Sequence, residues 1–133
     1  MKQNRTVLEA KRLEVFTCTL ECPLREAAER MTRREISALV VVDAHGDLQG
    51  IITRMDLLRA HLTHDDWERR PVAAHMTREV VTVEPDTLLK DVAEQLVGHH
   101  IHRVVVIQPE DGRRRPVAVV SGSDLVYHML KEV

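Results

Sequence analysis

The stretch GIITRMDLL, Gly50–Leu58, occurs a second time in the chain in the form AVVSGSDLV, Ala118–Val126. Each copy leads from an apolar run directly into an amphipathic segment, and a motif of the form Ser/Thr-x-x-Asp stands at the junction. Apolar runs rich in β-branched residues favour buried strands, whereas a hydroxyl residue followed three positions later by an acid is typical of a helix start. The two copies therefore predict a strand that passes directly into a helix, twice.

The similarity extends upstream of both junctions. Residues 15–43, VFTCTLECPLREAAERMTRREISALVVVD, align with residues 80–108, VVTVEPDTLLKDVAEQLVGHHIHRVVVIQ, at a constant shift of 65 positions (80 − 15). The junction aspartates, Asp56 and Asp124, are 68 positions apart (124 − 56), and the three extra residues fall in PEDGRRRP, which we interpret as a surface loop. The chain is one unit written twice, with predicted boundaries at 1–62 for the first repeat and its N-terminal segment, 63–71 for a linker and 72–133 for the second repeat.

Each repeat predicts the element order β–α–β–β–α. A short strand (15–18 or 80–83) leads to an amphipathic helix, then to a valine-rich strand (39–42 or 104–107), a return strand (48–52 or 116–120) and a closing helix. A repeat of about 60 residues buries too little apolar surface to be stable alone. We therefore expect an α/β (α+β) fold in which two pseudo-twofold-related repeats pack through their sheets.

Composition narrows the class of function. The 133 residues include 19 basic and 21 acidic side chains, a net charge of −2, and only one Trp, one Tyr and one Phe, so neither a basic field nor a stacking surface for nucleic acid is expected. No apolar run approaches the roughly 20 residues of a membrane span, and the start lacks the apolar centre of a secretory signal. Two cysteines, Cys18 and Cys22, suit a reduced, cytoplasmic protein.

The two junctions, Thr53–Asp56 and Ser121–Asp124, admit two interpretations. In one, each is a capping box that only closes the start of a helix. In the other, the helix N-terminus and the hydroxyl hold a phosphate, while the aspartate accepts hydrogen bonds from a vicinal diol such as that of ribose. The repetition of the motif favours the second interpretation without excluding the first.

At this point the sequence resembles a known family. The tandem copies are similar to paired cystathionine-β-synthase (CBS) domains, the Bateman module, over nearly the whole chain from about Val7 to Lys131. Further matching segments are His75-Met-Thr77, Ile36-Ser-Ala-Leu39 and Ile101-His-Arg-Val104. The resemblance implies a regulatory module that binds AMP, ADP, ATP or S-adenosylmethionine between the two copies and is not an enzyme.

The resemblance also assigns two sets of site residues. In the first, Asp124 would hold the ribose, Ser121 and Ser123 would lie near ribose or phosphate, and the adenine would lie against Phe16, Ile36, Ser37 and Ala38. The second, pseudo-symmetric site would use Asp56 and Thr53 with Met76, Val81, Ile101 and the backbone at His102. His102-Arg103 resembles the phosphate-facing pair of the family, and arginine can clamp a phosphate through two hydrogen bonds. The Asp124 site keeps more of the family pattern.

Two departures from that pattern concern the sites. Ala10-Lys11 stands where the family usually has Met-Ser or Met-Thr, and a Lys11 that points inward would add a phosphate contact. Met55 replaces a small residue and would crowd the Asp56 site.

Other features suggest weaker alternatives. His99-His-Ile-His102 could bind a metal, but His99 and His100 are predicted at a helix C-terminus, where basic side chains complement the dipole, so we expect no metal. Cys18 and Cys22 lack a second pair at zinc spacing, and no nucleophile elbow is present. We therefore expect no required cofactor and no catalysis, but a nucleotide-sensing homodimer that signals to an unknown effector protein. The alternatives are a ligand-free interaction or oligomerisation scaffold, an S-adenosylmethionine sensor and a metal sensor.

Overall fold

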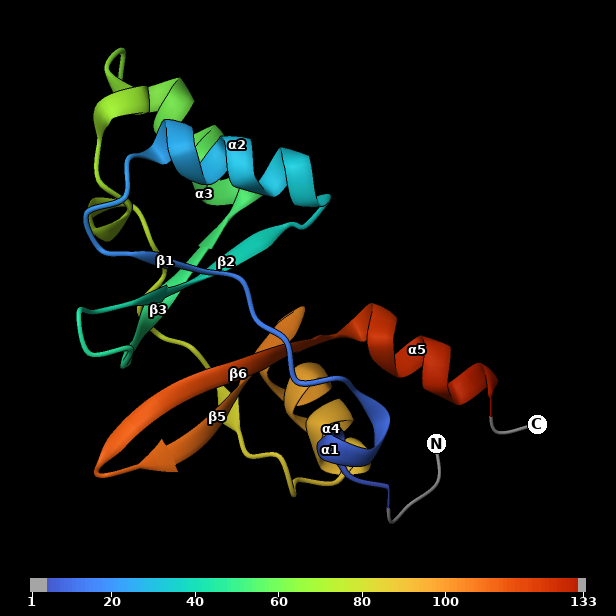
Figure 1. Ribbon diagram of the computed structural model, residues 1–133. Helices are drawn as coiled ribbons and strands as arrows, with labels where there is room; N and C mark the ends of the chain where they lie inside the picture. Colours follow the sequence, from blue (N-terminus) through green and yellow to red (C-terminus); the bar gives the residue numbers. More distant parts are fainter. Residues whose placement is uncertain (1–4, 132–133) are drawn as a thin grey trace. The chain divides into compact units, whose positions relative to one another are not determined.

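The computed structural model describes residues 5–131, which form two compact units (Figure 1). One unit comprises Phe16–Val80. The other combines the N-terminal residues up to Val15 with those from Val81 onward. The compact units therefore differ from the repeats read along the sequence, because the first residues of the chain fold with the strands and helices of the second repeat.

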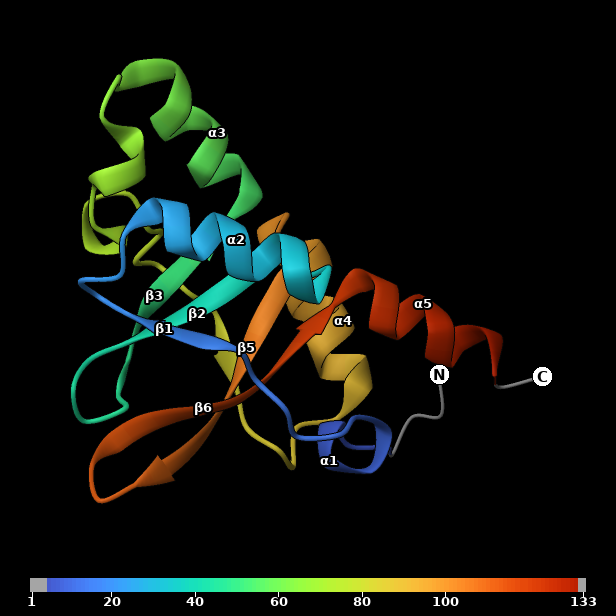
Figure 2. The same ribbon diagram turned by 45° about the horizontal axis from the view of Figure 1, so that its top comes forward.

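The Phe16–Val80 unit contains a three-stranded sheet in the order β1-β2-β3, and its helices α2 and α3 contact each other (Figure 2). Strand β1 runs parallel to β2, and β3 returns antiparallel to β2. This is the predicted β–α–β–β–α order, and the predicted linker contributes two short 3-10 helices. The elements are β1 (Thr17–Thr19), α2 (Leu24–Arg34), β2 (Ala38–Val42), β3 (Leu48–Thr53), α3 (Arg54–Thr63), η1 (Trp67–Arg69) and η2 (Val72–Ala74).

The second unit repeats this arrangement with a sheet in the order β4-β5-β6, in which β4 is parallel to β5 and β6 is antiparallel to it. An additional short helix, α1, precedes it in sequence and lies beside α4 in both views (Figures 1 and 2). The elements are α1 (Val7–Ala10), β4 (Thr82–Val83), α4 (Leu89–His99), β5 (Arg103–Glu110), β6 (Arg113–Ser121) and α5 (Gly122–Leu130).

The predicted loop PEDGRRRP is wrong in its extent. Most of this segment is strand, because β5 and β6 continue their pairing as far as Glu110 opposite Arg113. Only Asp111 and Gly112 form the turn, with φ values of 50° and 77°. Positive φ at both central residues is the geometry that Asp-Gly favours in two-residue hairpins, and this local preference outweighs the polar composition of the segment.

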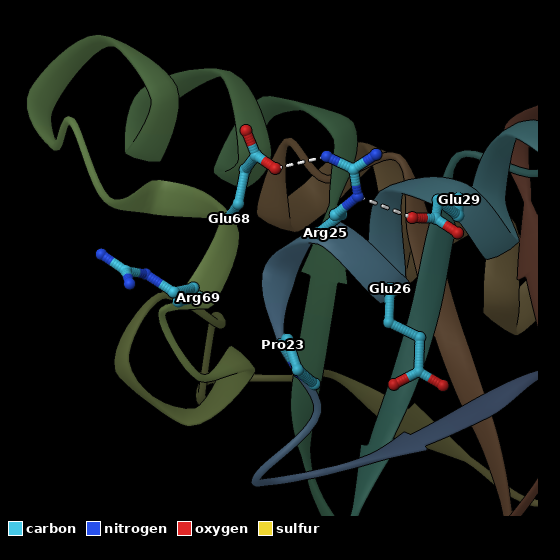
Figure 3. A pocket seen from close by; sticks show the side chains of 6 residues that line it. All are labelled: Pro23, Arg25, Glu26, Glu29, Glu68 and Arg69. Atoms are coloured by element: carbon cyan, nitrogen blue, oxygen red, sulfur yellow. Dashed lines mark hydrogen bonds and ion pairs between the residues drawn. The ribbon is translucent and has the colours of Figure 1, made fainter.

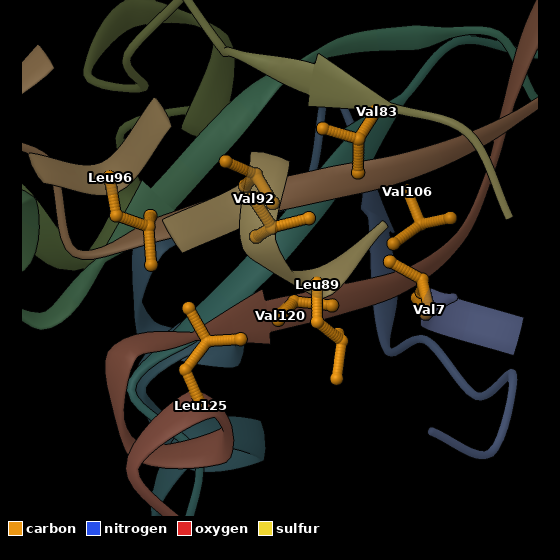
Figure 4. Packing of buried hydrophobic residues seen from close by; sticks show 10 residues of the cluster. Val7, Val83, Leu89, Val92, Leu96, Val106, Val120 and Leu125 are labelled. Carbon is orange, nitrogen blue, oxygen red and sulfur yellow. The ribbon is translucent and has the colours of Figure 1, made fainter. Parts of the chain in front are cut away.

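Helix α1 is tied to the second unit by its backbone and by one side chain. The side chain of Val7 is completely buried among the residues of α4, β4, β5, β6 and α5 (Figure 4). The amide of Val7 donates to the carbonyl of Thr87 at 2.9 Å, and the amide of Leu89 donates to the carbonyl of Arg5 at 2.9 Å. A helix of four residues is not stable by itself, so these contacts fix its position.

The core of the Phe16–Val80 unit includes both cysteines and is formed largely by α2, β2 and β3. Cys18 and Cys22 are buried and are not linked by a disulfide. Burial raises the pKa of the Cys18 thiol to about 12, so the thiol stays protonated at neutral pH and acts as a small apolar side chain. None of the helices within residues 5–131 has the length and apolar composition needed to cross a membrane.

Gly50 marks a close approach of two backbone segments in the Phe16–Val80 unit. The amide of its neighbour Ile51 donates to the carbonyl of Thr77 at 2.9 Å, and the amide of Thr77 donates back at 2.8 Å. A β-carbon at position 50 would lie 2.6 Å from the carbonyl oxygen of Thr77 and 3.0 Å from the sulfur of Met76. A side chain at this position would therefore force the backbone pair apart.

We predict that Gly50→Ala lowers the free energy of unfolding by about 1–3 kcal/mol, the usual cost of overpacking. Gly98→Ala is the matched control, because a β-carbon there meets nothing within 4 Å and the position is helical. That change should raise the free energy of unfolding by about 0.5–1 kcal/mol through higher helix propensity. Urea unfolding followed by circular dichroism measures both, and equal stability of the two variants would contradict the packing argument.

Candidate functional site

A capping box closes each strand-to-helix junction, as the local interpretation of the sequence predicts. In α5, the amide of Ser121 donates to Oδ2 of Asp124 at 2.8 Å, and the amide of Asp124 donates to the Ser121 hydroxyl at 3.4 Å. In α3, Thr53 and Asp56 make the same reciprocal pair at 2.9 and 3.3 Å. Both aspartates thus have a structural role at the N-terminus of a helix.

The same geometry limits what the helix N-termini can offer to a phosphate. The amide of Gly122 donates to the carbonyl of His102 at 3.1 Å, in addition to the two capping-box amides of Ser121 and Asp124. Three of the first four amides of α5 are therefore used, and the amide of Ser123 is the one left for an external acceptor. Helix α3 repeats this pattern, because the amide of Arg54 donates to the carbonyl of Ser37 at 3.1 Å. A phosphate at either junction would need a cationic side chain nearby.

Lys11 supplies such a cation at the Asp124 junction. Its ammonium lies 2.7 Å from Oδ2 of Asp124 and also donates a hydrogen bond to the carbonyl of Val119 on β6. The two charged side chains are 28% and 34% exposed, so the ion pair is partly shielded from water. Oδ2 receives donors from Lys11 and from the amide and hydroxyl of Ser121, whereas Oδ1 has no partner among residues 5–131.

These contacts determine the ionisation of Asp124. Partial burial alone would raise the pKa of the Asp124 carboxyl, but hydrogen bonds from the Lys11 ammonium and the Ser121 amide, together with the charge of Lys11, outweigh it. The pKa of Asp124 is therefore below its ordinary value. Asp124 is an anion at neutral pH, and it presents Oδ1 as an acceptor.

Asp56 occupies the corresponding position in the other unit but has a different environment. The side chain is only 7% exposed, and Oδ1 contacts the guanidinium of Arg59 at 3.4 Å, one turn further along the same helix. Because Oδ2 closes the capping box, both oxygens of Asp56 have partners within its own unit. Met55 beside it is exposed rather than packed.

The remaining predicted residues of the Phe16–Val80 unit lie along or near the edge of its sheet. Ala38 pairs with Thr53 between β2 and β3, and Ile36 packs against the core. The guanidinium of Arg34 lies 4.9 Å from the ring centre of Phe16, so one face of this predicted adenine contact already carries a cation. The carbonyl of Phe16 accepts from Val40 at 3.0 Å, and Met76 packs against the core.

In the other unit, the structure brings His102 and Arg103 next to the Ser121–Asp124 junction. Arg103 pairs with Ser121 between β5 and β6, and His102 provides the carbonyl that accepts from Gly122. Ser123 and the side chain of His102 are exposed. Val81 and Ile101 pack against the core, so their part in any ligand contact would be apolar.

The sequence identified Lys11 as a departure from the family pattern and as a phosphate contact, but it did not predict the ion pair with Asp124. The two residues are 113 positions apart, and Lys11 lies in the segment that the repeat boundaries assign to the first repeat. Its proximity to Asp124 depends on the packing of α1, for which the local sequence gives no signal.

A surface hollow of about 350 Å³ lies in the Phe16–Val80 unit, away from the predicted site residues (Figure 3). An ion-pair chain crosses it, in which the guanidinium of Arg25 contacts the carboxylates of Glu68 and Glu29. These side chains are 45–64% exposed, so the chain of charges lies in solvent. The hollow is lined by Pro23, Arg25, Glu26, Glu29, Glu68 and Arg69.

The histidine cluster follows the predicted helix end. Helix α4 ends at His99, and His100 has a left-handed conformation with φ of 53°, as a C-cap. This confirms the helix C-terminus as the position of His99 and His100. Within residues 5–131, no three or more His, Cys, Asp or Glu side chains gather in a way that could hold a metal ion.

We predict an acid-dependent stability contribution from the Lys11–Asp124 pair. Because the pKa of Asp124 is lower in the folded chain than in the unfolded chain, the pair stabilises the fold above about pH 4 and loses this effect as the pH falls through the folded pKa. Partial exposure limits the contribution to at most about 1 kcal/mol. Urea unfolding of the wild type and of Lys11→Met at pH 6 and near pH 2.5 should show a stability difference only at the higher pH. A difference that is equal at both values would contradict the ion pair.

Comparison with known proteins identifies the class to which this arrangement belongs. The family model described as CBS domain matches residues 9–63 and again residues 72–131. The chain therefore belongs to the CBS domain family, and it carries two CBS domains in tandem.

Solved structures extend the match to nearly the full chain. The CBS domain pair of protein MJ0100, solved in complex with 5′-methylthioadenosine and S-adenosyl-L-methionine, is 27% identical with a TM-score of 0.83, over 97% of this chain and 98% of that chain. A CBS-domain-containing protein from Agrobacterium tumefaciens, ATU1752, is 26% identical with a TM-score of 0.81, over 96% of each chain. The mixed α+β fold with two three-stranded sheets is that of CBS domain pairs.

Curated relatives are mostly longer proteins. L-aspartate semialdehyde sulfurtransferase from Methanocaldococcus jannaschii is 32% identical over 102 residues, which is 77% of this chain and 19% of the relative. The A-adding tRNA nucleotidyltransferase of Geobacter sulfurreducens is 30% identical over 94% of this chain and 13% of the relative. The chain thus spans well under half the length of these relatives, so their activities are not carried over to it.

Proposed function

We propose that this CBS pair is a regulatory module that binds an adenosine-containing nucleotide, AMP, ADP or ATP, and signals to a partner protein by a change of conformation. The observation that carries the proposal is the partly exposed Asp124 carboxylate, whose Oδ1 is unoccupied by other side chains of its unit. The adenosyl ligands of MJ0100, a CBS pair of similar fold, support this choice of ligand class.

The Asp124 junction offers complementary groups for a ribose and a nearby phosphate. Oδ1 of Asp124 can accept a hydrogen bond from a ribose hydroxyl. The ammonium of Lys11 has three donors, two of which are used by Asp124 and Val119, so one remains for a ligand oxygen. Arg103, on the strand that pairs with Ser121, adds a permanent positive charge to this unit. The adenine contacts suggested by the family resemblance, Phe16 and 36–38, belong to the other compact unit.

Signalling would follow from differential affinity. A ligand shifts a conformational equilibrium only if it binds one state more tightly than another. A nucleotide that binds residues of both units more tightly in one relative arrangement would favour that arrangement, which a partner protein could then recognise. The chain has no catalytic part in this proposal, and the nucleotide acts as a regulatory ligand rather than as a required cofactor.

One specific observation favours a second function, a ligand-free interaction scaffold. The two capping boxes and the Lys11 pair give the junction residues a complete structural role without any ligand. If no adenosyl ligand binds, the scaffold explains the same residues. S-adenosylmethionine and divalent metal ions belong to the same binding panel, because they distinguish the sensor alternatives.

We predict that Asp124→Asn weakens AMP or ATP binding at least tenfold, since a bidentate carboxylate acceptor becomes a neutral amide that also donates. Isothermal titration with AMP, ADP, ATP and S-adenosylmethionine measures the affinities. Asp56→Asn is the matched control, because it alters the equivalent capping box of α3 at a buried position.

The comparison separates a site effect from a folding effect. Equal loss of thermal stability in both variants, with loss of binding only in Asp124→Asn, supports the assignment. Nucleotide binding that survives Asp124→Asn unchanged would refute the site, and the absence of binding in the wild type would refute the nucleotide function in favour of the scaffold.

We further propose that the chain forms a homodimer through apolar helix surfaces. Helix α5 buries Leu125 in the core but leaves Val126, Met129 and Leu130 53–73% exposed, at the i, i+3 and i+4 spacing of one helix face. Helix α3 likewise exposes Leu58 and Leu62. Contiguous apolar surface of this kind is typical of protein–protein contacts.

We predict that the double variant Val126→Glu/Leu130→Glu is monomeric, because two carboxylates would have to be desolvated at the contact. Sedimentation velocity at micromolar concentration should show a dimer for the wild type and a monomer for the variant. Val97→Glu is the control, since Val97 is 75% exposed on a different helix and should leave the dimer intact. A monomeric wild type would contradict the proposal.

A further inference from the structure

The position of Lys11 is fixed by its own unit. It is the residue at which α1 ends, with its amide bonded to the carbonyl of Val7 at 2.9 Å, and Val7 is completely buried. Its ammonium then bridges the Val119 carbonyl and the Asp124 carboxylate. Because the backbone and the ammonium are both held, the positive charge is a permanent part of the junction and not a mobile surface group.

The pair changes the charge that a ligand meets. Asp124 alone would present a net charge of about −1, which attracts a cation and repels a phosphate. With Lys11 at 2.7 Å, the junction is a neutral ion pair with one acceptor, Oδ1, and one spare ammonium donor. At Asp56, the paired Arg59 guanidinium is 70% exposed and 3.4 Å from the carboxylate, so solvent screens its charge more strongly.

Adenosyl ligands differ in charge next to the ribose. In AMP, ADP and ATP the 5′ carbon of the ribose carries an anionic phosphate, whereas in S-adenosylmethionine it carries a sulfonium cation. Both groups lie a few bonds from the hydroxyls that Asp124 would hold. The sign of the charge at this junction therefore favours one class of ligand over the other.

We propose that Lys11 is a specificity-determining residue that makes the Asp124 site select 5′-phosphorylated adenosines over cationic S-adenosylmethionine. This inference rests on the proposed nucleotide function and specifies its ligand class. Lys11 removes the attraction of Asp124 for a sulfonium and provides a hydrogen-bond donor for a phosphate or ribose oxygen.

Two matched ligand pairs isolate the charge effect. AMP and adenosine differ by the phosphate, and S-adenosylmethionine and S-adenosylhomocysteine differ by the sulfonium charge. We expect the wild type to bind AMP more tightly than adenosine and to show no preference for S-adenosylmethionine over S-adenosylhomocysteine. This measurement needs no substitution, and the opposite pattern in the wild type would overturn the proposal.

Lys11→Met should reverse both preferences, because it exposes the charge of Asp124. We expect the ratio of AMP to adenosine affinity to fall about tenfold and the ratio of S-adenosylmethionine to S-adenosylhomocysteine affinity to rise by a similar factor. Lys11→Arg keeps the charge and should retain the wild-type preferences. Lys90→Met removes one positive charge from α4, where Lys90 contacts Glu94 at 4.0 Å, and should change neither ratio.

The outcomes separate the two proposals. If the wild type binds phosphorylated adenosines and Lys11→Met leaves both ratios unchanged, Lys11 is not the specificity residue, but the nucleotide function stands. If no adenosyl ligand binds to the wild type, the nucleotide function fails and the role of Lys11 fails with it. Circular dichroism of each variant confirms folding, and where Lys11→Met does not fold, the wild-type ligand pairs decide the proposal.

Discussion

One carboxylate oxygen, Oδ2 of Asp124, connects three segments of its unit. It accepts from the amide and hydroxyl of Ser121 at the end of β6, which closes the start of α5, and from the ammonium of Lys11 just after α1. Charge-assisted hydrogen bonds to a partly buried acceptor are stronger than neutral ones, so this atom holds the junction together. The direction in which α5 leaves the sheet and the charge at its N-terminus both depend on it.

The two junctions show how a repeated motif acquires different properties. Both contain the same capping box, yet the cation on Asp56 comes from its own helix, whereas the cation on Asp124 comes from a segment 113 positions away. The local contacts are the same because hydroxyl and carboxylate lie three residues apart in both. The asymmetry arises because the N-terminal segment packs on one unit, so only that junction gains Lys11. A pseudo-symmetric chain therefore has one junction with a buried carboxylate and one with an accessible ion pair.

The repeats, their β–α–β–β–α order and both capping boxes could be predicted from the sequence, since each depends on contacts between residues close in the chain. The histidines at the end of α4 belong to the same group, because a C-cap is a local structure. The prediction was wrong for PEDGRRRP, where polar composition suggested a loop. There, an Asp-Gly turn allows β5 and β6 to pair beyond the edge of the core, and backbone hydrogen bonds form without apolar burial.

The sequence by itself determined the duplicated unit, its hydrophobic pattern and the two Ser/Thr-x-x-Asp junctions, because these follow from periodicities and motifs that span a few residues. The tertiary structure decided where the N-terminal segment packs and therefore which carboxylate Lys11 contacts. Val7 is buried by apolar side chains that occur more than 70 positions later in the chain. No local pattern encodes such a choice, because it depends on how much apolar surface each unit leaves uncovered once its own helices have packed.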